Sequence, residues 1–415
     1  MKKKVFFKTF GCRTNVYDSQ VMMGALKEYD ITENEAEADV VVLNSCTVTN
    51  GADTHVRSYI SHVEKSSKAK IFLTGCGAHT KGEKLLEQGR VSGVFGQSEK
   101  LKIDSMLSRE KPFYDPGDLN YVDKAVVDDF VGKSRAFIKI QEGCDFRCSY
   151  CIIPFVRGDA RSMDEEKILE QITRLALNGF GEFILTGTNV GSYGQKTNSS
   201  MAKLMKKISQ IRGVRRIRLG SVEPIQIDDE FKELLGEPWL EKHLHVALQH
   251  TSPQMLRHMN RRNVYKQDKE LFELLASKGF AIGTDFITGH PGESQELWEE
   301  AMNNVRDLPL THLHAFTYSK RDGTPSSTMK PEVNGKVAKQ RLHELESIIK
   351  EKNMSFRNSF SGELEVLLES EKDGLYVGYD QHFNKIMIES DEDLLGNWIN
   401  IQNYKIQEEN NYARI

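Results

Sequence analysis

Short apolar runs, separated by longer polar stretches, set the pattern of the N-terminal part of the chain. They occupy residues 5–7, 40–43 and 71–73, and a glycine or a small polar residue follows each one closely. Runs of this length that end in turn residues are typical of buried strands in a parallel sheet, and the stretches between them are long enough for helices. The pattern predicts an open parallel α/β domain over residues 1–125.

A second alternating segment begins after a turn-rich stretch at 111–118. Apolar runs again alternate with helical patterns, at residues 136–140, 183–185, 217–219, 245–248, 281–287 and 313–316. Alternation of this kind indicates a parallel β/α array with its active site at the carboxyl ends of the strands. We therefore predict a second domain over residues 130–358.

The pattern changes to period two near the C-terminus. From residue 363 onward, apolar and polar residues alternate between glycine-containing turns, which predicts a small antiparallel β-barrel over residues 359–415. Residues 363–415 carry twelve Asp and Glu against four Lys and Arg. Because an acidic surface repels phosphate, we expect this unit to contact protein, or to touch RNA only through aromatic side chains such as Tyr376, Tyr379 and Phe383.

Composition limits the class of protein. The chain has 415 residues, 28% of them charged and 39% hydrophobic, as expected of a multidomain globular protein, and its net charge of −4 does not by itself indicate nucleic-acid binding. No apolar stretch of 7–15 residues, the length of a signal-peptide core, follows the basic start at residues 1–4. We therefore expect no signal peptide, no membrane span and a cytoplasmic location in which thiols stay reduced.

Three of the six cysteines lie close together in the sequence. Cys144, Cys148 and Cys151 are spaced C-x3-C-x2-C. Three thiolates can hold three irons of a four-iron cluster and leave the fourth iron open to a small molecule. A structural zinc site would need a fourth ligand, and no Cys or His follows Cys151 before His243. The spacing favours a reactive iron–sulfur cluster over a zinc knuckle.

The other three cysteines, Cys12, Cys46 and Cys76, each follow an apolar run of the N-terminal part. In open α/β sheets, functional groups collect at the carboxyl ends of strands, so these thiols are expected to converge. Buried cysteines that serve only as small hydrophobic residues are the alternative. Three equivalent positions favour a second three-cysteine cluster.

These motifs resemble those of a known family. The C-x3-C-x2-C loop, with Tyr150 before its last cysteine, resembles the signature of radical S-adenosylmethionine (SAM) enzymes. With the upstream triad, it resembles the methylthiotransferases. The similarity extends along nearly the whole chain, through the segments 10–19, 38–49, 74–76, 154–162, 185–194, 284–293 and 318–325.

The resemblance implies a fold and a set of cofactors. It implies an N-terminal methylthiotransferase domain, a partial (β/α)6 radical SAM barrel and a C-terminal module similar to TRAM domains. It also implies two [4Fe–4S] clusters, one on each triad, and two SAM molecules per turnover. One SAM methylates a sulfur on the upstream cluster, and the other yields the radical at the loop cluster. A flavodoxin or ferredoxin is the implied type of electron donor, whereas the sulfur source stays unknown.

Further contact residues are predicted around the barrel. Polar residues at strand ends are candidates for SAM contacts: Thr188, Asn189, Ser221, Glu223 and Gln249. The forked donors of Arg157 and Arg161 could hold a carboxylate or a sugar. Three basic clusters are candidates for RNA phosphate contacts, although such clusters are usually solvated faces: Arg212, Arg215, Arg216 and Arg218; Arg257, Arg261 and Arg262; Lys320, Arg321 and Lys330.

The substrate is predicted from the resemblance as well. Segments 44–49, 139–144, 221–224 and 243–245 are most similar to the MtaB-type branch, which adds a methylthio group to C2 of N6-threonylcarbamoyladenosine beside the tRNA anticodon. The anticodon stem-loop is then the implied partner. Branches that modify N6-isopentenyladenosine or a ribosomal-protein aspartate stay open, as does a radical enzyme that acts on a small molecule and has a structural second cluster. The cysteine loop argues against a non-enzymatic RNA-binding protein.

Overall fold

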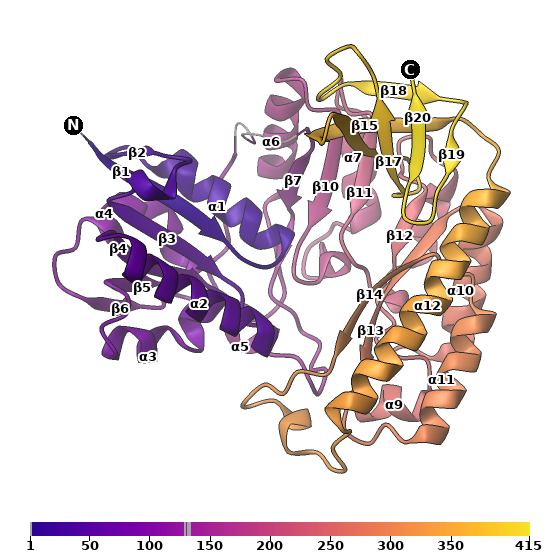
Figure 1. Ribbon diagram of the computed structural model, residues 1–415, viewed down its shortest axis with the longest axis horizontal. Helices are drawn as coiled ribbons and strands as arrows, with labels where there is room; N and C mark the ends of the chain where they lie inside the picture. The colour runs from indigo at the N-terminus through magenta and orange to yellow at the C-terminus, as the bar shows by residue number, and fades with distance from the viewer. Residues whose placement is uncertain (1, 128–129, 131–133) are drawn as a thin grey trace.

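The computed structural model describes residues 2–127, 130 and 134–415. Six parallel strands form the N-terminal sheet (Figure 1), in the order β2-β1-β3-β4-β5-β6. Their bounds are β1 (Lys3–Thr9), β2 (Tyr29–Ile31), β3 (Val40–Ser45), β4 (Lys70–Gly75), β5 (Gly93–Phe95) and β6 (Phe113–Asp115). The predicted boundary between the first two units, at 125–130, includes residues 128–129, which lie outside the described residues.

Helices cover both faces of this sheet. Helices α2 (Asn50–Ser66) and α3 (Gly82–Glu87) pack on one face, while α1 (Arg13–Ala25) and α4 (Ile103–Leu107) pack on the other. Every residue of β3 is buried, because its side chains alternate between the two helical layers. Burial on both faces explains why the central strands are continuous apolar runs.

The second unit is a partial barrel of six parallel strands. They are β7 (Ala136–Lys139), β10 (Glu182–Thr186), β11 (Arg216–Leu219), β12 (His243–His245), β13 (Ala281–Thr288) and β14 (His312–Thr317). Two three-stranded sheets, β11-β10-β7 and β12-β13-β14, are joined by parallel bridges from Ile217 to Leu240 and from Val222 to Val246. A short antiparallel pair, β8 (Gln141–Glu142) and β9 (Arg161–Ser162), lies beside the barrel.

Amphipathic helices cover the outside of the barrel. They are α6 (Glu165–Leu177), α7 (Met201–Ser209), α8 (Asp229–Lys232), α9 (Pro253–His258), α10 (Tyr265–Ser277), α11 (Gln295–Asp307) and α12 (Gly335–Ser359). The short helix α5 (Ile153–Arg157) packs instead against Cys76 of the N-terminal unit. In α6, Asp164 caps the first turn by accepting a hydrogen bond from the Lys167 N–H, and Ile168, Ile172 and Leu175 face the core at helical spacing. None of the helices formed by the described residues is long and apolar enough to cross a membrane.

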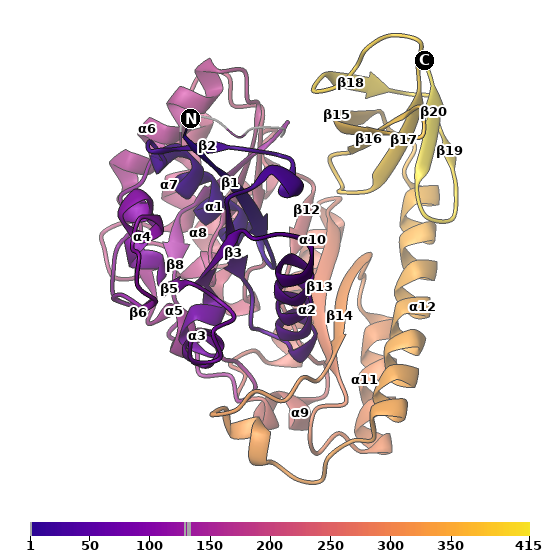
Figure 2. The same cartoon turned by 60° about the vertical axis from the view of Figure 1, so that its left-hand side comes forward.

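The C-terminal unit is a curled sheet at the end of α12, away from the N-terminal sheet (Figure 2). Its strands are β15 (Leu364–Lys372), β16 (Leu375–Tyr379), β17 (Lys385–Glu389), β18 (Trp398–Ile401), β19 (Lys405–Ile406) and β20 (Asn411–Arg414). The order is β18-β15-β16-β17-β20-β19, and all pairs are antiparallel except β17–β20. The three structural units together confirm the predicted fold class.

The turn between β16 and β17 docks this sheet onto the barrel. The Phe383 ring stacks on His243 of β12, with ring centroids 5.1 Å apart, and on Tyr379 at 4.9 Å. Arg218 of β11 donates to the Asp380 carbonyl oxygen at 2.8 Å. Tyr376 is buried in the core of the sheet. Tyr376 is therefore not available to RNA, whereas Tyr379 and Phe383 are partly exposed and their contact with RNA stays a prediction.

Candidate active site

Cys144, Cys148 and Cys151 lie on the loop between β8 and α5, and each is partly buried. Two nitrogen donors from the barrel face this loop triad. Asn189 Nδ2 donates to Cys144 Sγ at 3.4 Å, and the Arg261 guanidinium donates to Cys148 Sγ at 3.6 Å. Hydrogen bonds to cysteine sulfurs are a standard means of tuning an iron–sulfur cluster.

The thiols of the loop triad are poor acids on their own. Burial, with smaller contributions from Cys148 and Cys144, raises the pKa of Cys151 to about 12. Burial also raises the pKa of Cys144. A bound metal deprotonates such thiols outright, and partly exposed thiols on one loop, with N–H donors aimed at two of them, suit a metal cluster. The donor set therefore fits an iron–sulfur cluster.

The other triad lies at the carboxyl edge of the N-terminal sheet. Cys12 follows β1 and is exposed, whereas Cys46 follows β3 and Cys76 follows β4, and both are buried. A Cβ added at Gly11 would lie 3.0 Å from Cys46 Sγ, so the first strand end touches the second. Burial, then the neighbouring thiols of Cys76 and Cys12, raise the pKa of Cys46 to about 11. The sheet brings together the three cysteines of this edge triad.

Arg157 connects the two triads. It ends α5, the helix that follows Cys151, and its side chain is 1% exposed. Its Nε–H donates to Cys76 Sγ at 3.2 Å, and Cys76 also packs against Ile152 and Val156. The first turn after the loop triad is therefore in contact with the edge triad.

A buried charge network holds Arg157 in place. Arg157 donates to Asp18 Oδ2 at 3.0 Å and to Glu142. Lys139 lies 2.7 Å from carboxylate oxygens of both Asp18 and Asp123, and Lys100 lies 2.8 Å from Asp18. Burial alone would raise the pKa of Asp123, but Lys100 and Lys139 lower it to about 2. Because Asp18 belongs to α1 and Lys139 to β7, the network joins the N-terminal sheet to the barrel.

A second contact joins the N-terminal unit to the barrel, at the loop that follows its last strand, β14. Arg321, in the loop after β14, donates to Asp53 Oδ2 at 2.9 Å and to the Thr47 carbonyl oxygen at 2.6 Å. Ser319 Oγ accepts from the Asn50 N–H at 2.8 Å. The N-terminal sheet is thus bound on two sides of the barrel opening.

Several arginines predicted to contact phosphate are buried instead. Arg216 and Arg218 are 2% exposed and pair with Glu182, and the Arg261 side chain is 1% exposed and pairs with Glu223. Arg321 is also buried. Their predicted phosphate contacts are wrong, because charge in a sequence does not reveal burial. The exposed members of the predicted clusters are Arg212, Arg215, Arg257, Arg262, Lys320 and Lys330.

Two of the residues predicted to contact SAM lie at the loop triad. Thr188 Oγ1 donates to the Gly143 carbonyl oxygen at 2.7 Å, beside Cys144. Asn189 is 6% exposed, and its Oδ1 has no hydrogen-bond partner among the described residues. A buried acceptor without a partner is costly, so Asn189 Oδ1 is suited to a ligand N–H.

The remaining predicted SAM contacts differ in their surroundings. Glu223 binds Arg261, with NH1 2.8 Å from Oε1, and Ser221 is exposed. Gln249 has a left-handed φ of 67°, and its backbone N–H donates to the Asp285 carbonyl oxygen. Arg157 and Arg161 donate to protein acceptors, Arg161 to the Tyr121 carbonyl oxygen at 2.6 Å among others. The two arginines are therefore already held by protein acceptors. A contact with SAM stays a prediction for all five of these residues.

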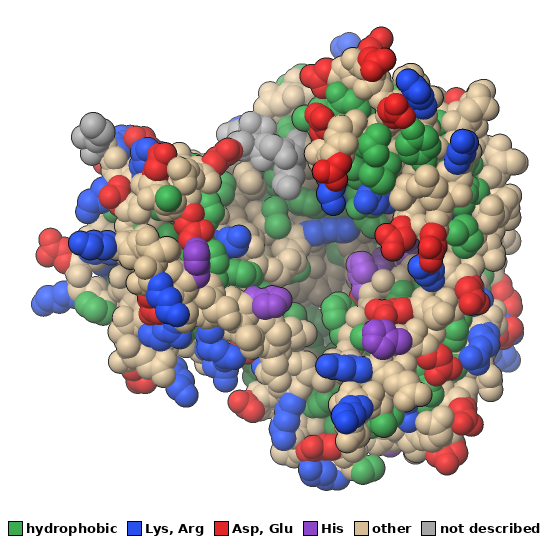
Figure 3. Space-filling view, in the orientation of Figure 1, with side chains coloured by type: hydrophobic (Ala, Val, Ile, Leu, Met, Phe, Trp, Pro, Cys, Tyr) green, Lys and Arg blue, Asp and Glu red, His purple; other side chains and the backbone are tan. Residues whose placement is uncertain are grey.

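The barrel opens on a hollow that is visible in Figure 3, with basic and histidine side chains on its walls. Strands β12, β13 and β14 present polar residues on their inward face, which we call the histidine wall: His243, His245, Asp285, His312 and His314. The opposite face of these strands carries Leu244, Ile282 and Phe286 to the helical layer. The wall is polar because it lines an opening rather than a core.

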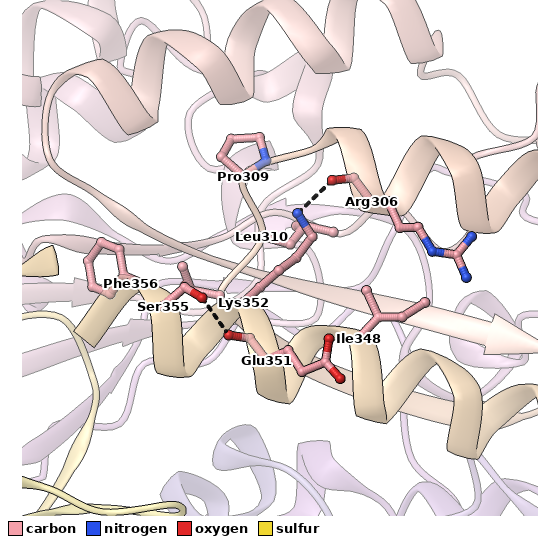
Figure 4. Close-up of a pocket in the computed structure, with 9 residues that line it drawn as sticks. Arg306, Pro309, Leu310, Ile348, Glu351, Lys352, Ser355 and Phe356 are labelled. Atoms are coloured by element: carbon pink, nitrogen blue, oxygen red, sulfur yellow. Dashed lines mark hydrogen bonds between the residues drawn. The ribbon is translucent and has the colours of Figure 1, made fainter. Parts of the chain in front are cut away.

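A surface groove lies elsewhere (Figure 4). It has a volume of ≈ 540 Å³ and lies between the end of α11 and α12. Lys352 Nζ donates there to the carbonyl oxygens of Arg306 and Leu308, at 2.7 and 2.9 Å. Its lining includes no residue of either triad, so we assign it no part in the chemistry.

Sequence reasoning missed the supports of both triads. The sequence places Arg261 in a basic cluster typical of a surface, and nothing in its local pattern distinguishes Lys100 or Asp123. Lys139 offered the clearest signal, because a lysine inside the apolar run 136–140 predicts a buried partner of opposite charge. The partner itself, Asp18, lies in another domain and could not be named from local pattern.

Comparison with known proteins agrees with this arrangement. Residues 4–96 match the family described as "Uncharacterized protein family UPF0004", and residues 138–305 match the radical SAM superfamily. In the solved structure of the radical SAM methyltransferase TsrM from Kitasatospora setae, 77% of that chain superposes on 79% of this one, with a TM-score of 0.62 and 16% identity. This similarity shows the shared fold.

Similar curated proteins point to one chemistry. A Helicobacter pylori (strain J99) protein whose name places it among the methylthiotransferases is 53% identical over 99% of both chains. The threonylcarbamoyladenosine tRNA methylthiotransferase MtaB of Bacillus subtilis is 32% identical over 96% of this chain and 93% of its own. A tRNA-2-methylthio-N(6)-dimethylallyladenosine synthase of Wolinella succinogenes is 35% identical over 85% of this chain and 84% of its own. This chain therefore belongs to the radical SAM methylthiotransferases, enzymes whose superfamily implies a [4Fe–4S] cluster and SAM.

Proposed function

We propose that this enzyme inserts a methylthio group at C2 of N6-threonylcarbamoyladenosine next to the anticodon of tRNA. We assign a [4Fe–4S] cluster to Cys144, Cys148 and Cys151, and a second one to Cys12, Cys46 and Cys76. When bound, these clusters and SAM supply the radical and the methylthio sulfur. A flavodoxin or ferredoxin would supply electrons, and the cytoplasm is the expected location.

The contact between Arg157 and Cys76 carries this proposal. Methylthio transfer needs a sulfur source close to the place where the radical forms. Arg157 Nε lies 3.2 Å from Cys76 Sγ, on the helix that begins just after Cys151. The helix turn that follows Cys151 is therefore in contact with the edge triad, which supports the proposal that reactants at the two triads are held close to each other. Such fixed proximity is a large source of rate enhancement.

The protein side chains have distinct tasks in this scheme. Asn189 Oδ1 is suited to accept from the amino group of SAM, while Thr188 holds the backbone at Gly143. Glu223 keeps the Arg261 guanidinium directed at Cys148. Because the target base must leave the anticodon stack to reach the hollow, base extrusion is part of the proposal.

The histidine wall favours the threonylcarbamoyl substrate over the dimethylallyl one. A threonylcarbamoyl group carries a carboxylate, a hydroxyl and amide N–H groups, whereas a dimethylallyl group is purely apolar. The wall offers imidazoles from β12 and β14 around Asp285. A site built for hydrogen bonds rejects an analogue that lacks them, because its buried polar groups are left unpaired. Relatives of both kinds are similarly distant, so the proposal of the threonylcarbamoyl branch is supported by this chemical argument and not by sequence identity.

Nucleoside analysis of bulk tRNA tests the substrate. We expect a strain without this protein to lose 2-methylthio-N6-threonylcarbamoyladenosine and to accumulate the unmodified threonylcarbamoyl nucleoside in liquid chromatography–mass spectrometry. Complementation with the wild-type chain should restore the product, whereas a Cys148→Ala chain should not. Loss of the methylthio-isopentenyl nucleoside instead, or an unchanged profile, would contradict the proposal.

A further inference from the structure

The histidine wall contains a compact set of metal-binding side chains that neither triad uses. In the registered strands, His245 lies opposite Gly283, and Asp285 lies opposite His314. All three side chains project from the inward face of the sheet, away from the helical layer. Their ligand atoms lie within 4.8 Å of one another.

The individual distances match those between neighbouring ligands of one ion. His245 Nε2 lies 3.1 Å from Asp285 Oδ1, and His314 Nδ1 lies 3.7 Å from the same oxygen. With metal–ligand bonds of about 2.0–2.2 Å, adjacent ligand atoms are separated by roughly 3.0–3.5 Å. Side-chain shifts of less than 1 Å, on the order allowed at a surface-lining site, would therefore close the set around an ion.

The local backbone is suited to this arrangement. A Cβ at Gly283 would lie 2.6 Å from His245 Nδ1 and 2.9 Å from His243 Nε2, so only glycine lets the two imidazoles lie over β13. Behind them, His243 packs against His312, with ring centroids 4.8 Å apart, and stacks on Phe383. Packing of this kind restricts the rotation of the imidazoles, as supports around metal ligands do.

The contacts within the set leave ligand capacity unused. His245 Nε2 has no hydrogen bond of good geometry with any described residue, although Asp285 is near. His245 is buried, whereas the His314 side chain is 60% exposed on the hollow side. The set is therefore closed toward the sheet and open toward the hollow.

We propose that His245, Asp285 and His314 bind one divalent transition-metal ion, with open coordination positions that face the hollow. Two histidines and one carboxylate with open positions form a known ligand set for reactive divalent ions, and imidazole suits zinc, iron, nickel and copper. Oxygen donors of a ligand in the hollow could then complete the coordination. These side chains belong to the same histidine wall that the proposed function places around the substrate, so the inference concerns the same site.

Zinc binding to the cluster-loaded enzyme tests this site. The anaerobically purified holoenzyme is dialysed against Zn²⁺ and washed, and zinc and iron are measured by mass spectrometry. We expect a single retained zinc per chain with unchanged iron. Asp285→Asn and His314→Gln should lose that zinc and keep the iron. His343→Gln is the matched control, because the His343 side chain is 77% exposed on α12, and it should retain the zinc.

X-ray absorption at the zinc edge separates this site from the cysteine triads. A coordination shell of nitrogen and oxygen alone is expected. A sulfur-dominated shell, or equal zinc retention in the wild type and in Asp285→Asn, would overturn the proposal. Because His314 is exposed, His314→Gln is expected to fold normally, so misfolding would not explain a loss of zinc. Thermal unfolding of each variant checks this. No tRNA enters the measurement, so the site and the proposed substrate can fail separately.

Discussion

The edge triad of Cys12, Cys46 and Cys76 is assembled from three strand ends, whereas the loop triad of Cys144, Cys148 and Cys151 belongs to one short loop. Each triad nevertheless receives one buried arginine. Arg157 donates to Cys76 Sγ, and Arg261 donates to Cys148 Sγ. A buried guanidinium opposite a thiolate-rich centre offsets negative charge that burial would otherwise make costly.

The groups behind the two arginines differ. Arg157 rests on a network of fully buried charges from both domains, which includes Asp18 of the N-terminal unit and Lys139 of the barrel. Arg261 rests on barrel residues alone. It binds Glu223 and, through Nε, Asn263, which donates to Asp268 at 2.7 Å. The edge triad therefore depends on domain docking, while the loop triad depends on the barrel only.

Replacing the cysteines of one triad at a time should have the largest effect on iron content and activity. It should also separate the task of the edge triad from that of the loop triad. We expect about eight irons per reconstituted chain, and about four after replacement of either set of three cysteines by alanine. Loss of Cys144, Cys148 and Cys151 should abolish both 5′-deoxyadenosine release and methylthio transfer. Loss of Cys12, Cys46 and Cys76 should abolish transfer but leave 5′-deoxyadenosine release. Equal iron in the wild type and the edge-triad variant would argue against a second cluster.

Lys139→Met should break the support of the edge triad. It leaves Asp18, Asp123 and Glu142 without a cation that lies 2.7–3.2 Å away. Removing one partner from a buried ion pair costs about 3–5 kcal/mol, which should appear in the first transition of urea denaturation. Lys350→Met is the control, because its pair with Glu408 lies at the surface, where solvent screening leaves an ion pair little effect on stability. Equal losses in the free energy of unfolding for Lys139→Met and Lys350→Met would show that the buried charge network does not stabilise the contact between the domains.

Arg157→Lys and Arg261→Lys keep a charge but lose the forked donor. Changes to groups that orient metal ligands typically cost about 10–100-fold in affinity or activity. Arg157→Lys should slow methylthio transfer more than 5′-deoxyadenosine release, and Arg261→Lys should slow both. Reduction potentials of the two clusters, measured by redox titration, should shift for one cluster in each variant. A shift of both clusters in both variants would contradict the separate supports.

Asp268→Asn should have the smallest effect, which is a change in how the free energy of unfolding depends on pH. Burial raises the pKa of Asp268 to about 6. The folded state then binds more protons than the unfolded state between about pH 4 and 6, so stability falls as pH rises through this window. At pH 7.5 the wild type should be less stable than Asp268→Asn by about 2–3 kcal/mol, and near pH 4 the two should agree. Urea denaturation at both pH values measures this, and a pH-independent difference would refute the shift.

Local spacing was enough for the loop triad, because its three ligands lie on one loop and need no distant partner. The edge triad also followed from the sequence, since apolar runs predicted strands and parallel strands end at one edge. Side-chain burial did not follow. Arg216, Arg218 and Arg261 read as basic surface, yet each is buried against a carboxylate.

The chain pattern by itself determined the three structural units, the two cysteine sets and the family. Only the tertiary structure decided that Arg157 joins the triads, that Phe383 lies on His243, and that His245, Asp285 and His314 converge. The physical reason is the range of the interactions. Strand and loop formation depend on neighbours in sequence, whereas a buried charge or a ligand set is completed by residues that folding brings from distant segments.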